Sequence, residues 1–231
     1  HLDCRRQRQM CIRDRYYNCM SAAKISVAKK AIDHIKKKLT KDMILGIGTG
    51  STVNFFIEQL EEYKSYFKGA VSSSEASSKL LREKNIEVFS LNDVNEVAFY
   101  IDGADEVSSE NCLIKGGGGA HTREKIVAAA ANEFICIVDK SKLVEVLGSF
   151  PLPIEVIPES RSMISRKISS MGGRPIYRMG FITDQGNQII DVHNMTINDP
   201  TALEILLNNI PGVVDNGIFA FNKPETVLIS E

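Results

Sequence analysis

The sequence predicts an α/β fold, in which a Rossmann-like parallel sheet domain is joined to a second, smaller ferredoxin-like α+β domain. As far as residue 149, short apolar segments alternate with segments whose apolar residues recur every three or four positions. This alternation is typical of a mostly parallel sheet covered by helices on both faces. After Pro151 the order becomes strand, helix, strand, strand, helix and strand, which is the ferredoxin-like arrangement.

The first domain is expected to comprise residues 21–149 together with 224–231. Its helices are predicted from apolar residues at helical spacing, over residues 24–39, 53–63, 75–85 and 122–133. Its strands are predicted from short, largely apolar runs, over residues 43–47, 69–73, 86–90, 97–101, 111–115 and 134–139. The segment TVLIS, residues 226–230, is expected to return to this sheet as a further strand.

The second domain is expected over residues 150–223. Its strands are predicted over residues 153–157, 174–179, 181–184, 188–192 and 213–221, with a polar turn, QGN, before the fourth of them. Its two helices are predicted over residues 160–171 and 200–210.

Composition narrows the classes of partner. The 231 residues are 43% hydrophobic and 25% charged, with a formal net charge of -1, so bulk charge gives no attraction to nucleic acid or to an anionic membrane. No apolar run reaches the roughly 18 residues that a membrane-spanning helix needs. We therefore expect a cytoplasmic protein with no nucleic acid and no membrane as partner.

The first 20 residues differ in character from the rest. They contain five arginines, show neither helical nor strand periodicity and lack the apolar core of a secretion signal. We expect an unstructured or non-native extension over residues 1–20. Three of the five cysteines lie there, whereas Cys112 and Cys136 lie in apolar runs as small buried hydrophobes. An odd number of cysteines without metal-ligand spacing indicates reduced thiols.

Four polar or glycine-rich loops follow predicted strands, at the sheet edge where ligands bind. The first is GIGTGST, residues 46–52, whose glycines let the backbone approach an anion at the start of a helix. The hydroxyls of Thr49, Ser51 and Thr52 add donors suited to phosphate. A tight turn or a dinucleotide site are alternatives, but the latter requires GxGxxG and an acid after the next strand. Here that strand ends in serines 72–74.

The second and third loops are the serine run 72–74 and DGADE, residues 102–106. One serine hydroxyl is enough to cap the following helix, so a ligand contact there is a weaker expectation. Three carboxylates behind a buried strand repel one another unless a cation, a metal or a polar ligand lies between them. A solvated turn and a magnesium site are alternatives, but Lys115 on the next strand is the expected partner.

The fourth loop is Lys115 followed by four glycines, 116–119. Consecutive glycines are unfavourable in conformational entropy and indicate a backbone that contacts a ligand closely or moves. The next helix places Glu124 in its first turn, where it could serve only to stabilise the helix dipole. Beside a lysine, two aspartates and the glycines, Glu124 is the best candidate for a catalytic base. The helix dipole and Lys115 are both expected to favour its ionised form.

The segments GIGTGST, VSSSEAS, DGADE and KGGGGAHTREK, in this order and spacing, resemble the ribose-5-phosphate isomerase A family, as do FICIVDKSK and LPIEVIP. The resemblance runs from about residue 21 to the C-terminus. It implies isomerisation of D-ribose 5-phosphate to D-ribulose 5-phosphate, in the non-oxidative branch of the pentose phosphate pathway, with no cofactor and no metal. It also implies a homodimer or homotetramer.

The resemblance assigns roles residue by residue. Glu124 matches the catalytic base, with Asp102, Asp105 and Lys115 as further catalytic residues. The substrate contacts of the family match Thr49, Gly50, Ser51, Thr52, Asp102, Gly103, Ala104, Asp105, Lys115, Gly116, Gly117, Gly118 and Lys142.

The mechanism expected from these roles has two stages. An aspartate, Asp102 in the first instance, helps to open the furanose ring. Glu124 then moves a proton from C2 to C1 through an enediolate, whose oxyanion is stabilised by Lys115 and the glycine N–H groups. Residues 49–52 hold the phosphate, assisted by Lys142 and by Lys29 or Lys30.

Two other functions are open at this stage. One is a phosphosugar-binding sensor domain without catalysis, although residues 1–20 are too short for the helix-turn-helix of a transcription regulator. The other is an NAD-dependent enzyme, which the missing acid after the second strand disfavours.

Overall fold

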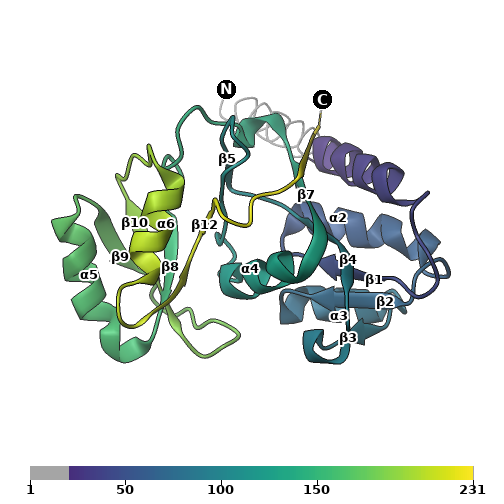
Figure 1. Ribbon diagram of the computed structural model, residues 1–231, viewed down its shortest axis with the longest axis horizontal. Helices are drawn as coiled ribbons and strands as arrows, with labels where there is room; N and C mark the ends of the chain where they lie inside the picture. The colour runs from purple at the N-terminus through teal and green to yellow at the C-terminus, as the bar shows by residue number, and fades with distance from the viewer. Residues whose placement is uncertain (1–20, 231) are drawn as a thin grey trace, which may run out of the picture.

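The computed structural model describes residues 21–230 (Figure 1). The extension expected over residues 1–20, with its three cysteines, lies outside this range. A helix over residues 21–35, purple in Figure 1, opens the described chain.

A six-stranded parallel sheet forms the larger half of the fold, in the order β13-β7-β4-β1-β2-β3. Its strands are β1 (Ile44–Ile47), β2 (Gly69–Ser72), β3 (Val88–Phe89), β4 (Val97–Asp102), β7 (Ala131–Val138) and β13 (Thr226–Ile229). Its helices, besides the one over 21–35, are α2 (Ser51–Leu60), α3 (Glu75–Glu83) and α4 (His121–Ala130). The strand order reverses between β1 and β4, and such a switch point is where open α/β sheets bind ligands.

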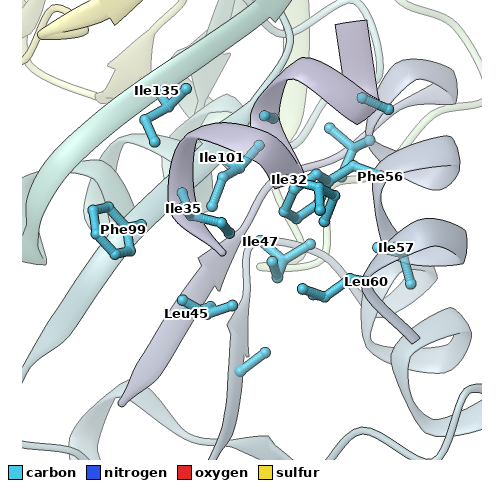
Figure 2. Packing of buried hydrophobic residues seen from close by; sticks show 14 of the residues in the cluster. Ile32, Ile35, Leu45, Ile47, Phe56, Ile57, Leu60, Phe99, Ile101 and Ile135 are labelled. Atoms are coloured by element: carbon cyan, nitrogen blue, oxygen red, sulfur yellow. The ribbon is translucent and has the colours of Figure 1, made fainter. Parts of the chain in front are cut away.

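Both faces of this sheet are covered, which explains why its strands are continuous apolar runs. Figure 2 shows one face, where the first helix and α2 pack on β1, β4 and β7 through a buried cluster that includes Ile32, Ile35, Leu45, Ile47, Phe56, Ile57, Leu60, Phe99, Ile101 and Ile135. On the other face, Val127 of α4 packs against Tyr100 and Phe134. The buried Cys136 belongs to this second cluster, as expected for a small hydrophobe.

The second sheet is antiparallel, in the order β11-β8-β10-β9. Its elements follow the chain as β8 (Leu152–Val156), α5 (Arg161–Ser170), β9 (Arg174–Tyr177), β10 (Gln188–His193), α6 (Pro200–Asn208) and β11 (Val213–Asn216). In Figure 1 this unit lies to the left of the parallel sheet. The predicted ferredoxin-like order is confirmed, and so is the return of the last strand, β13, to the parallel sheet.

Some predicted strands are corrected by the structure. The run 111–115 does not join the parallel sheet, because its β6 (Leu113–Ile114) pairs antiparallel with β5 (Glu106–Val107) and β12 (Ile218–Phe219) in a small third sheet. The run 213–221 divides between β11 and β12, and residues 181–184 form no strand. The division falls at Gly217, where a Cβ would lie 2.3 Å from the carbonyl oxygen of Lys115.

The predicted helix over 122–133 ends early. Its alanine run favours a helix, but β7 already begins at Ala131, which pairs with Val97 of β4. The partition of the chain at residues 149 and 223 stays a prediction. Within residues 21–230, none of the helices is long and apolar enough to cross a membrane.

Candidate active site

A cavity of about 250 Å³ lies at the carboxyl ends of β1, β4 and β7, beside the switch point of the parallel sheet. Its lining includes Glu124 and every residue of the predicted substrate set except Asp102. The other lining residues are Lys24, Ile137, Val138, Asp139 and Ser141. The structure therefore brings three of the four predicted loops to one cavity, and the serine run 72–74 lies behind its wall.

The N-terminus of α2 provides a place for an anion. Its N-cap is Gly50, at a φ of 120° that favours glycine. No side chain caps the helix, and its first turn contains no acidic residue. The Nζ of Lys24 lies 2.9 Å from the Oγ of Ser51, and Lys142 lines the same cavity. Free N–H groups, a helix dipole and two cations together suit a phosphate dianion.

Lys24 is a site residue that the sequence analysis missed. The assisting role was assigned to Lys29 or Lys30, but neither lines the cavity, and Lys30 Nζ donates to the carbonyl oxygen of Ile229 at 3.0 Å. All three lysines lie on the helix over residues 21–35. Only the packing of that helix on the sheet decides which of them reaches α2, so the sequence carried no separate signal for Lys24.

The serine loop acts behind the cavity wall. Ser72, Ser73 and Ser74 are buried and do not line the cavity. Ser74 caps α3 by accepting from the N–H of Ser77, while the Thr49 hydroxyl bonds to Ser73 at 3.0 Å and to Ser74 at 2.8 Å. The weaker expectation of a ligand contact is thus not met. The serines orient Thr49 instead.

Asp102 is fully buried and saturated with donors. Its Oδ1 accepts from the N–H groups of Thr49 at 3.1 Å and Gly103 at 2.7 Å. Its Oδ2 accepts from the Tyr100 hydroxyl at 2.5 Å and lies 2.7 Å from Lys115 Nζ. A Cβ on Gly48 would lie 2.0 Å from the Asp102 carboxyl carbon. Asp102 therefore ties the first loop to Lys115. It was predicted to contact the substrate, but it does not line the cavity.

Lys115 joins the two central carboxylates. Its Nζ lies 2.7 Å from Asp102 Oδ2 and 3.2 Å from Glu124 Oε2, and it donates to the carbonyl of Gly103 at 2.5 Å. Lys115 and Glu124 are 3% and 4% exposed. Apart from this ion pair, Glu124 Oε2 has no hydrogen-bond partner among residues 21–230. Glu124 also lines the cavity, so its carboxyl group lies where it can take a proton from a bound molecule.

The electrostatics of Glu124 differ from the sequence prediction. Burial, and then the charge of Asp102, raise the pKa of Glu124 to about 8, against the opposing effect of Lys115. Burial alone would lower the pKa of Lys115, but Asp102 and Glu124 raise it above its ordinary value. One cation thus faces two buried carboxylates. Lys115 favours the ionised form of Glu124, as expected, but desolvation and the charge of Asp102 outweigh it.

A pH profile follows from this shift. A base must be ionised to take a proton, so kcat/KM should rise about tenfold per pH unit below the pKa of Glu124 and level off above about 8. The phosphate of a sugar phosphate ionises near pH 6, below this window. Initial rates between pH 6 and 9.5 measure the profile. A kcat/KM that is constant from pH 6.5 upwards would contradict the raised pKa.

The three carboxylates of DGADE avoid one another by taking separate partners. Asp105 Oδ2 accepts from the N–H of Gly117 at 2.8 Å and lines the cavity. Glu106 accepts from the N–H groups of Gly148 at 2.7 Å and Phe150 at 2.5 Å. Among the described residues, no cluster of three or more His, Cys, Asp or Glu side chains is placed to hold a metal ion.

The helix that carries Glu124 is anchored to the second sheet. Thr122 donates to the buried Glu155 of β8 at 2.5 Å. Lys125 Nζ lies 2.9 Å from Glu204 and 2.8 Å from Asp215. These buried contacts lie on either side of Glu124 in the sequence and fix the first turn of α4 in the cavity wall.

Comparison with known proteins identifies the family of this chain. The family model described as ribose 5-phosphate isomerase A (phosphoriboisomerase A) matches residues 69–231. A ribose-5-phosphate isomerase A from Mannheimia succiniciproducens is 55% identical over 203 residues, which cover 87% of this chain and 91% of the relative.

Solved structures are similar over almost the whole chain. Ribose 5-phosphate isomerase A from Neisseria gonorrhoeae is 46% identical with a TM-score of 0.87, and the match covers 92% of this chain and 93% of that one. A D-ribose-5-phosphate isomerase in complex with phospho-erythronic acid is 39% identical with a TM-score of 0.82, covering 90% and 93%. This chain belongs to the ribose-5-phosphate isomerase A family.

Proposed function

We propose that this protein interconverts D-ribose 5-phosphate and D-ribulose 5-phosphate, with Glu124 as the base that moves a proton between C2 and C1. The observation that carries the proposal is the buried Asp102–Lys115–Glu124 arrangement, whose Lys115 and Glu124 line one cavity with the anion site of α2. A sensor would need only the anion site. A buried carboxylate with a raised pKa is unfavourable for binding alone and is typical of acid–base chemistry. The sensor alternative is therefore not favoured.

Binding places the phosphate at the start of α2. The N–H groups of its first turn, Lys24 and Lys142 hold the dianion, and Thr49 is kept in place by the serine loop. Fixing the phosphate fixes the carbon chain beside Glu124, which supplies much of the rate enhancement of a well-oriented reaction.

Ring opening needs a carboxylate that reaches the sugar, and Asp105 is the better placed of the two aspartates. Asp102 already accepts from four donors and does not line the cavity, whereas Asp105 lines it and accepts through one oxygen, Oδ2. In this step the anomeric hydroxyl loses its proton, the ring C–O bond breaks and the ring oxygen gains a proton. Asp105 carries that proton.

Isomerisation then follows on the open aldose. Glu124 takes the C2 proton and the electron pair forms the enediolate, whose C1 oxygen becomes negative. Lys115 and the N–H groups of the glycine loop stabilise this charge. Glu124 then returns the proton to C1, the proton of the C2 hydroxyl passes to the C1 oxygen, and C2 becomes the ketone carbon.

The proposed activity is tested by an assay with purified protein and D-ribose 5-phosphate in the presence of EDTA, following ketose formation. Turnover that EDTA leaves unchanged supports an acid–base mechanism carried by the protein's own side chains. Loss of activity with EDTA, restored by a divalent metal, would contradict it.

The assignment of ring opening to Asp105 predicts a change in the limiting step. In Asp105→Asn, ring opening should become slow, so kcat should fall by about 10–100-fold, and the primary isotope effect with substrate deuterated at C2 should fall towards one. Glu124→Asp, in contrast, should keep a full isotope effect, because C2–H cleavage then limits the rate. An undiminished isotope effect in Asp105→Asn would show that Asp105 acts elsewhere.

We also propose that the protein is a cytoplasmic homodimer or homotetramer. Two exposed apolar side chains on the loop between β9 and β10 support an interface there: Met179 is 85% exposed and Ile182 is 56% exposed. Light scattering gives the mass in solution, and a mass near 25.6 kDa would be that of a single chain.

A further inference from the structure

We propose that Arg178, on the second sheet, is a positioning residue for this reaction: it holds the carbonyl groups of the glycine loop (residues 116–119) so that N–H groups of that loop face the substrate. The inference rests on the proposed function, which requires donors to the enediolate oxygen. Nothing in the sequence patterns singled out Arg178. Its role comes from contacts between the two larger units of the fold.

Arg178 follows β9 and reaches across to the glycine loop. Its Nη1 lies 3.3 Å from the carbonyl oxygen of Gly116 and 3.2 Å from that of Gly117, and its Nη2 lies 3.3 Å from the Gly116 oxygen. On its other side it forms a forked ion pair with Asp191 of β10, with Nη2–Oδ1 at 2.5 Å and Nε–Oδ2 at 2.9 Å. The two side chains are only 19% and 20% exposed, which limits screening of the pair by solvent.

The direction of the loop's N–H groups follows from these contacts. In a trans peptide the C=O and N–H bonds point in opposite directions, and the described chain contains no cis peptide. Because Arg178 holds the carbonyls of Gly116 and Gly117, the N–H groups of Gly117 and Gly118 point away from it. The Gly117 N–H donates to Asp105 Oδ2 at 2.8 Å. The Gly118 N–H has no acceptor within residues 21–230, and Gly118 lines the cavity.

The glycine loop cannot fix this orientation by itself. It has no side chains to pack, and Gly116 and Gly119 have φ values of 100° and 79°, in the region that glycine tolerates. The N–H of Gly119 donates to the carbonyl oxygen of Gly116 at 2.9 Å and closes the turn, but this bond does not include the peptide between Gly117 and Gly118, so contacts from outside must orient that peptide. Phe181 supports it on the same side as Arg178, since a Cβ on Gly119 would lie 2.3 Å from Phe181 Cζ, and the guanidinium lies 5.3 Å from the Phe181 ring centre.

The cation behind the carbonyls adds an electrostatic effect. A guanidinium bound to a peptide oxygen polarises that peptide and makes its N–H a stronger donor. For the peptide between Gly117 and Gly118, the strengthened N–H is the one that faces the cavity. Arg178 thus acts on the oxyanion through the loop and does not touch the substrate.

The test replaces Arg178 by methionine, which keeps the length of the side chain and removes the donors. We expect Arg178→Met to lower kcat by about 10–100-fold while KM for ribose 5-phosphate stays within about threefold, since the phosphate site is untouched. Arg178→Lys should not restore kcat, because one ammonium cannot bridge two carbonyls and both oxygens of Asp191.

A matched control is Arg161→Met on α5. Arg161 also donates to a side chain of the second sheet, Gln188, at 3.1 Å and stacks 4.2 Å from the Tyr177 ring centre, but it does not line the cavity or contact the glycine loop. Its kcat should stay within about twofold of the wild type. If Arg178→Met does not fold, Asp191→Asn is tested instead. This variant keeps the guanidinium but weakens the ion pair that orients it, and it should lower kcat by about 3–10-fold.

Inhibitor binding separates positioning from a loss of stability. Phospho-erythronic acid, which a related isomerase binds, carries a carboxylate whose oxygens can take the place of the enediolate oxygens. Its Kd should rise in Arg178→Met by the same factor as kcat/KM falls, whereas the Kd of inorganic phosphate should not change. A lower melting temperature with unchanged kcat and inhibitor affinity would overturn the inference and leave the proposed function standing. A wild-type protein without turnover would overturn both.

Discussion

Replacing Glu124 by glutamine is expected to lower kcat by about 10²–10⁴-fold while KM for ribose 5-phosphate changes little. Glutamine fills the same space in the wall of the cavity but cannot accept the C2 proton. The phosphate site at the start of α2 does not include Glu124, so substrate affinity should survive. Steady-state kinetics on both proteins measure the effect. Near-normal turnover in Glu124→Gln would end the assignment of the base.

Glu124→Gln is also expected to change the melting temperature in a pH-dependent way. The folded pKa of Glu124, about 8, lies above its unfolded value of 4.5, so its contribution to stability is complete below about pH 4.5 and is lost as pH rises through about 8. At pH 8.5, Glu124→Gln should therefore melt about 2–8 °C above the wild type, and the difference should vanish near pH 4. Glu75→Gln is the matched control. It is an exposed first-turn glutamate, on α3, and should change neither kcat nor this pH dependence.

Replacing Lys115 by methionine is expected to lower both activity and stability. The change leaves Asp102 and Glu124 as two buried carboxylates without their shared cation. Breaking a buried pair in this way costs about 3–5 kcal/mol, or roughly 6–20 °C in melting temperature for a chain of this size. Loss of the charge that faces the enediolate should lower kcat by about 10²–10³-fold. Thermal unfolding and kinetics at 25 °C or below measure the two effects separately.

A double variant separates the effect of Lys115 on stability from its effect on kcat. Lys115→Met combined with Asp102→Asn removes one charge of each sign, and asparagine still accepts from the N–H groups of Thr49 and Gly103 through Oδ1. We expect the double variant to regain most of the lost stability and none of the lost kcat. If the double variant is no more stable than Lys115→Met, charge balance is not what holds the site together.

The fold could be predicted to a large extent because its strands are short apolar runs at regular spacing. Runs such as Ile44–Ile47 are buried on both faces of the parallel sheet, and that burial is visible as an uninterrupted apolar segment. The same rule failed for residues 111–115, which are equally apolar but pair in the small third sheet. A buried run identifies a strand, whereas its partners are set by contacts with residues that lie far away in the sequence, such as those of β12.

The site, like the fold, could be predicted from the sequence only in part. The loops that follow β1, β4 and β6 carry their chemistry in consecutive residues, so their convergence at the carboxyl edge of the sheet could be predicted. Lys24 and Arg178 could not, because each reaches the site from an element of ordinary composition through packing alone. The raised pKa of Glu124 could not be predicted for a similar reason. Sequence shows the neighbouring lysine but does not show that the carboxylate is 4% exposed and shares that lysine with Asp102.

The central claim is that one carboxylate moves the proton between C2 and C1, and the most direct test follows hydrogen at C1 of the product. The reaction is run in D₂O with unlabelled ribose 5-phosphate, and ribulose 5-phosphate is examined by NMR at low conversion. A single base on one face of an enediolate, able to exchange its proton with solvent, should place deuterium at one of the two C1 positions only. Ketose without solvent deuterium would mean that Glu124 returns the C2 proton before it exchanges, whereas deuterium at both C1 positions would contradict the account, because one base on one face delivers a proton to one side only.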